Sequence, residues 1–105
     1  MADISEQDFR LAADEAIEQA ERALLALPGS DDFEVERQGG VLQIVFEEPT
    51  ATKFVVSPNA PVRQIWVSAL SRSFKLSWTG GATFALDGEP LQALLARLVA
   101  EFLNR

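Results

Sequence analysis

The chain has 105 residues, a formal net charge of −7 and no cysteine or histidine. These counts exclude disulfides, thiolate zinc sites and every catalytic centre that depends on a Cys or His side chain. Residues 1–48 hold 13 acids and 3 bases, a net charge of −10, whereas residues 49–105 have a net charge of +3. An acidic half of this size repels phosphate backbones and attracts cations or basic protein surfaces, so no nucleic-acid partner is expected.

The length and hydropathy of the chain limit its class. The whole chain, 1–105, should form one domain, because a chain of this length buries enough surface for one modest core. No apolar run approaches the ~18 residues that span a membrane, and the first residues lack the basic segment of a secretory signal. We therefore expect a cytoplasmic protein without a membrane partner.

The first predicted element is a helix of about twenty residues that begins after Ser5 and ends before Pro28 and Gly29. Ser5 suits the N-cap, since its hydroxyl can accept a hydrogen bond from a backbone N–H of the first turn. Apolar residues recur at helical spacing on one face: Phe9, Ala13, Ala16, Ile17, Ala20, Leu24 and Leu27. The opposite face carries acids, and Leu11 and Leu25 project near it, which is unusual for a purely solvated surface.

Turn residues divide the middle of the chain into predicted strands at 33–37, 41–46, 52–57, 62–69, 73–78 and 82–86. In most of these strands alternate residues are apolar, as a sheet with one buried face requires. Residues 57–61 contain Pro58 and Pro61 and are predicted to form a tight connection without regular strand pairing.

The last predicted element is a helix that starts near Pro90. Its apolar stripe consists of Leu91, Leu94, Leu95, Leu98, Val99 and Phe102. Both helices must cover the same side of the sheet, because only one sheet face is apolar. The order of helix, antiparallel meander and helix predicts an α+β two-layer sandwich. The groove between the helices, either sealed or partly open, should be lined by Leu24, Leu27, Leu98 and Phe102.

A first candidate site is a series of carboxylates on the first helix and on the segment that follows it. The candidate metal ligands are Asp14, Glu18, Glu21, Asp31, Asp32, Glu34 and Glu36. Carboxylates suit iron, manganese, calcium or magnesium, but without His or Cys such a site is weak and loosely selective. The plainer interpretation is a solvated acidic face. Against it, like charges four residues apart cost on the order of a few tenths of a kcal/mol per pair, and few bases relieve them here.

A second candidate site is the open sheet face around Trp66. Alternation along residues 64–69 directs Ile65, Val67 and Ala69 toward the core and Trp66 toward solvent. A large exposed aromatic side chain among polar neighbours is typical of an anchor for a protein partner. From this pattern alone, packing of Trp66 under a loop or a long side chain is an equally good interpretation.

Several segments resemble the frataxin family, the small iron-binding regulators of iron–sulfur cluster assembly. They are Gly40–Leu42, Pro61, Gln64–Ser68, Ser77–Gly80, and Asp87–Gly88 followed by Leu91, Leu94 and Leu95. The similarity covers nearly the whole chain, and the length matches the bacterial branch. The resemblance implies a frataxin-like fold and a monomer, and it leaves open whether iron drives oligomerisation.

The same resemblance implies roles for both candidate sites. The acids would bind Fe²⁺ or Fe³⁺ weakly and face a cysteine desulfurase. The open sheet face would contact the iron–sulfur scaffold protein through Asn59, Gln64, Trp66 and Lys75. Leu25 and Ala26 stand where relatives carry further acids, which lowers the expected iron capacity.

The rival interpretation is a small acidic adaptor whose sheet binds an unrelated protein and whose acids hold no specific metal. An enzyme is not expected, because paired carboxylates could act as acid and base only in a cleft, and these should be exposed on a convex helix face.

Overall fold

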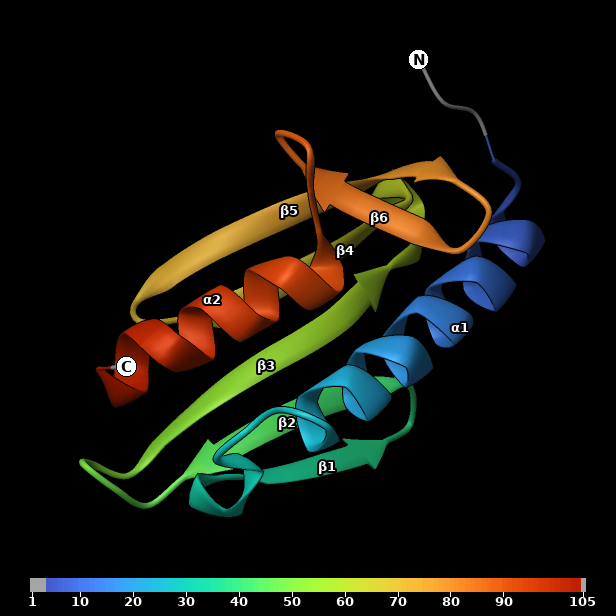
Figure 1. The fold of residues 1–105 in the computed structure, drawn as a ribbon. Helices are drawn as coiled ribbons and strands as arrows, with labels where there is room; N and C mark the ends of the chain where they lie inside the picture. Colours follow the sequence, from blue (N-terminus) through green and yellow to red (C-terminus); the bar gives the residue numbers. More distant parts are fainter. Residues whose placement is uncertain (1–3, 105) are drawn as a thin grey trace.

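The computed structural model describes residues 4–104, in which two helices pack on one face of an antiparallel sheet (Figure 1). The elements in chain order are α1 (Glu6–Leu25), η1 (Ser30–Asp32), β1 (Glu34–Gln38), β2 (Val41–Phe46), β3 (Thr52–Asn59), η2 (Ala60–Val62), β4 (Gln64–Ala69), β5 (Arg72–Gly80), β6 (Thr83–Leu86), β7 (Glu89–Pro90) and α2 (Leu91–Leu103). The strands lie in the sheet in sequence order, from β1 to β7. This arrangement confirms the predicted two-layer α+β sandwich.

Helix α1 forms for the reasons that its sequence indicates. The Ser5 hydroxyl accepts a hydrogen bond from the Asp8 backbone N–H at 3.1 Å, so Ser5 is the N-cap. The predicted apolar stripe faces the sheet, with Phe9 and Ala20 fully buried. The helix ends at Leu25, slightly before Pro28. No helix within residues 4–104 is long and apolar enough to cross a lipid bilayer.

The core lies between the helices and the inner face of the sheet. Near the end of α2, the centroid of the Phe102 ring lies 4.6 Å from that of Phe46 and 6.0 Å from that of Phe54. Leu24 and Leu98 are buried, while Leu27 and Phe102 are half-buried. The groove between the helices is therefore filled at Leu24 and Leu98, while its end at Leu27 and Phe102 stays partly exposed.

Two strand predictions were wrong at the turn that precedes Trp66. Strand β3 continues through Pro58 to Asn59, and both residues pair with β4. Pairing between β2 and β3 begins at Leu42–Val56, so at Pro58 the strand has a neighbour on one side only, where a missing N–H is tolerated. Val62 lies in η2 instead of β4, and Arg63 takes a left-handed conformation with φ 56°.

The entry to α2 contains a strand that was not predicted from the sequence. β7 comprises two residues that pair with β6, and Pro90 is also the N-cap of α2. Glu89 accepts two hydrogen bonds from the Arg97 guanidinium, at 2.9 and 2.8 Å. This contact lowers the pKa of the Glu89 carboxyl, mainly through the hydrogen bonds from Arg97. The ion pair thus ties the short strand to the helix.

Candidate functional site

The sheet face that the helices leave uncovered brings together the four residues predicted to contact a partner. Trp66 of β4 pairs with Lys75 of β5, and Asn59 of β3 pairs with Gln64. Their burial fits the predicted alternation, because Ile65 and Val67 are buried on the helix side while Gln64 and Trp66 are half-buried on the other. Paired residues on adjacent strands share one face of a sheet. We call Asn59, Gln64, Trp66 and Lys75 the tryptophan cluster.

Trp66 is held in place by its neighbours in the tryptophan cluster. Its indole Nε1 donates a hydrogen bond to Gln64 Oε1 at 2.9 Å. The Lys75 ammonium lies 4.9 Å from the centroid of the indole ring, within the range of a cation–π contact. The ring is therefore oriented before any partner arrives, and it is only partly covered. The contacts with Gln64 and Lys75 are those expected if Trp66 packs against its neighbours to stabilise the sheet. The part of the ring that remains exposed is available to a binding partner.

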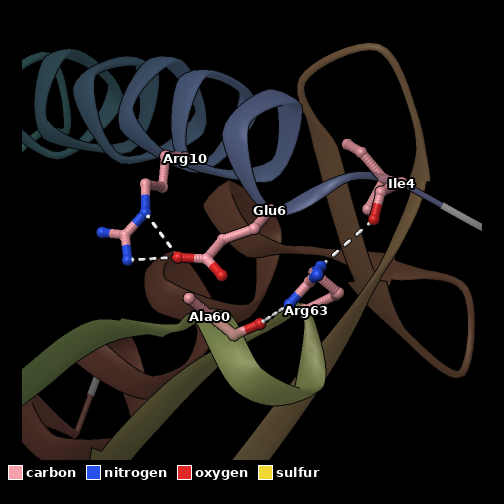
Figure 2. Close-up of polar contacts among 5 residues, drawn as sticks. All are labelled: Ile4, Glu6, Arg10, Ala60 and Arg63. Atoms are coloured by element: carbon pink, nitrogen blue, oxygen red, sulfur yellow. Dashed lines mark hydrogen bonds and ion pairs between the residues drawn. The ribbon is translucent and has the colours of Figure 1, made fainter.

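Arg63 connects the start of β4 to the segment that precedes α1 (Figure 2). Its Nε donates to the Ile4 carbonyl at 3.1 Å, and a terminal nitrogen donates to the Ala60 carbonyl. Glu6 lies beside it and pairs with Arg10 at 2.7 Å. The hydrogen bond and the positive charge of Arg10 lower the pKa of the Glu6 carboxyl, and the positive charge of Arg63 lowers it to a smaller extent.

Arg63 is not among the contact residues predicted from the sequence. One of its two partners is the backbone of Ile4, which is distant in the chain, so no local spacing marks that contact. The structural feature that marks this position is the positive φ of Arg63, which is uncommon for a non-glycine residue. The sequence alone does not reveal it.

The seven candidate metal ligands are divided between two surfaces. Asp14, Glu18 and Glu21 lie on α1, where Glu18 pairs with Arg22 at 2.6 Å and Glu21 with Arg37 of β1 at 3.4 Å. Arg37 therefore reaches toward the helices. The alternate residues of β1, Glu34 and Glu36, are exposed and pair with the half-buried Val45 and Gln43 on the opposite sheet face.

Part of the acidic set lines an open hollow of about 400 Å³ at the edge of the sheet. Its walls contain Asp31 and Asp32 of η1, Glu34 of β1, and Glu47 and Glu48 after β2, together with Phe33 and Val45. Glu47 and Glu48 are not among the predicted ligands, because only the antiparallel return of β2 brings them beside η1.

The acids do not converge on one point. Across residues 4–104, no three carboxylates are placed so that they could hold a metal ion together. An open hollow with several hard oxygen donors can attract a cation electrostatically, while fixed coordination needs the side chains to move inward. The arrangement thus suits loose cation capture and contact with a basic surface.

Comparison with known proteins points to one family. A family model described as a frataxin-like domain matches residues 2–105. The iron–sulfur cluster assembly protein CyaY of Janthinobacterium sp. (strain Marseille) is 33% identical over 101 residues, covering 93% of this chain and 89% of that protein. The protein of the same name from Herminiimonas arsenicoxydans is 32% identical over 101 residues, with 93% of this chain and 89% of the relative covered.

A solved structure has the same fold. Frataxin from Psychromonas ingrahamii matches with a TM-score of 0.78 and 17% sequence identity, covering 97% of this chain and 94% of that one.

Proposed function

Because the chain belongs to the frataxin-like family, we propose that it is a weak iron-binding protein that serves iron–sulfur cluster assembly. The observation that carries this proposal is that relatives aligned over 93% of the chain are named iron–sulfur cluster assembly proteins. With no cysteine of its own, the chain cannot hold a cluster through thiolates. Cluster assembly would therefore take place on a partner protein, which this chain supplies with iron or regulates.

The two surfaces would have different partners. The acids of α1 and of the hollow would attract iron and the basic surface of a cysteine desulfurase, since opposite charges steer association. The tryptophan cluster would meet the scaffold protein or its junction with the desulfurase, because a pre-oriented, half-buried Trp is a favourable anchor. Both roles are binding roles, consistent with a family that is not a conventional enzyme family.

A second candidate function is a protein-interaction adaptor with no specific metal role. It is favoured by the lack of three convergent carboxylates among residues 4–104. Under this alternative, iron would compete with other divalent cations without preference, and only protein contacts would matter.

An Fe²⁺ titration followed by NMR, combined with pull-down of the desulfurase and scaffold encoded in the same genome, tests the proposal. We expect changes confined to the amides near Asp31, Asp32 and Glu34 and to the acids of α1, at iron concentrations where Mg²⁺ produces none. Capture of neither protein would contradict the assembly role. Equal responses to Fe²⁺ and Mg²⁺, with both proteins captured, would favour the adaptor.

A further inference from the structure

Two leucines on the outer face of α1 are exposed to solvent. Leu11 is 67% exposed and Leu25 is 57% exposed, and within residues 4–104 the third large hydrophobic residue in this state is Val62 of η2, at 52%. The remaining large apolar side chains of α1 face the core. Neither exposed leucine contributes much to folding, which raises the question of what these side chains contact.

The two leucines lie in line along the helix. They are 14 positions apart with Glu18 midway, and an α-helix drifts only about 20° for every seven residues, so all three lie on one face. At 1.5 Å per residue, the leucines are about 21 Å apart along the axis. Leu11 also borders two hollows, of about 360 and 460 Å³. A side chain from a partner can therefore pack against Leu11 from either side.

The helix surface between the leucines is acidic. Residues 12–24 carry four carboxylates and one guanidinium. The side chain of Asp14 makes no ion pair or hydrogen bond within residues 4–104, while Glu18 and Glu21 are each paired with one arginine. A complementary surface would be basic at its centre and apolar at its two ends.

A second copy of the chain does not meet this requirement. Two helices related by a two-fold axis would place Leu11 against Leu25 of the other copy, but the four carboxylates and one guanidinium of residues 12–24 would then face a surface of the same net negative charge. Such facing like charges oppose the contact. The charge of the helix therefore selects a different, basic protein.

We propose that Leu11 and Leu25 are apolar contacts at the two ends of the surface through which α1 binds its basic partner. The partner surface would present a basic centre and two apolar side chains about 21 Å apart. This inference rests on the proposed function, because it takes the cysteine desulfurase as that partner. The proposed interface combines charged and apolar contacts. The charges would accelerate association, and the leucines would slow dissociation.

The test compares Leu11→Gln, Leu25→Gln and the matched control Val62→Gln in binding to the purified desulfurase. Glutamine is a good helix former, so α1 should keep its stability, which thermal unfolding verifies. Each leucine variant should bind at least about fivefold more weakly, whereas the control should bind like wild type. This loss should persist at high salt, where the effect of Asp14→Asn should shrink because exposed charges are screened.

Two outcomes separate this inference from the function on which it rests. If the wild-type chain binds and Asp14→Asn weakens binding, yet both leucine variants bind like wild type, the inference is wrong and the proposed function stands. If the wild-type chain does not bind the desulfurase, the proposed function fails and the inference fails with it. Self-association of the wild type that Leu11→Gln abolishes would overturn the inference in favour of a second copy.

Discussion

At the scale of single residues, Trp66 has two separable contributions. Its hydrogen bond to Gln64 and its contact with Lys75 contribute to folding, and its exposed ring area is available to a partner. Trp66→Ala should lower the free energy of unfolding by about 1 kcal/mol, the scale of one net hydrogen bond. It should weaken the complex with the scaffold and desulfurase by about 2 kcal/mol or more, as loss of a hot-spot residue does.

The matched variant for this prediction is Trp66→Phe, which keeps an aromatic face beneath Lys75 but removes the Nε1–H donor to Gln64. We expect it to retain more binding than Trp66→Ala, as measured by calorimetry. A large drop in melting temperature for Trp66→Ala, together with unchanged affinity, would identify the ring as structural cover.

At the scale of elements, Arg63 joins the start of β4 to the segment before α1 (Figure 2). Arg63→Gly should preserve the left-handed turn, since glycine adopts positive φ without steric cost, but it removes the side chain that holds Ile4. We expect faster amide exchange at Phe9, whose N–H is bonded to the Ser5 carbonyl at 2.8 Å, and a shifted Trp66 indole resonance.

Ser71→Gly is the control for this substitution. Ser71 also has positive φ, at 61°, but it lies at the opposite end of β4, in the turn before β5. It should leave the exchange of Phe9 unchanged. Equal effects of the two variants on Phe9 would mean that glycine itself, and not the loss of the Arg63 contacts, loosens the start of α1.

The elements also show how far the sequence predicts this fold. The alternation of apolar and polar residues was sufficient to predict that Ile65 and Val67 are buried and that Trp66 points outward, because the side chains of a strand alternate between its two faces. It did not predict the pairing of Pro58, which depends on where β2 begins, or the contact of Arg63 with Ile4. Glu47 was missed as a neighbour of Asp31 for the same reason: the strand register, and not sequence spacing, sets that proximity.

At the scale of the whole molecule, a partner could be attracted by the acidic surface of α1 or by the net negative charge of the whole protein. Two variants that remove one charge at different places distinguish these cases. Asp14→Asn and Asp87→Asn remove the same charge by the same chemistry, so both change the net charge from −7 to about −6. Asp14 lies on α1, whereas Asp87 lies in the turn between β6 and β7 with φ 52°, a conformation that asparagine tolerates. The two variants therefore have the same total charge and differ only in the place from which a negative charge is removed.

If the acidic face of α1 is the surface that binds the desulfurase, Asp14→Asn should weaken the complex by about two- to fivefold at low salt, the range for one exposed ion pair. Asp87→Asn should leave the affinity unchanged. The affinity of the wild type should fall as ionic strength rises, because exposed charges more than ~8 Å apart are screened at physiological salt, and Asp14→Asn should reduce that dependence. Binding measured by calorimetry at several salt concentrations tests both points.

Equal losses for the two variants would mean that net charge attracts the partner without a defined acidic surface. A salt-independent affinity would rule out electrostatic attraction altogether.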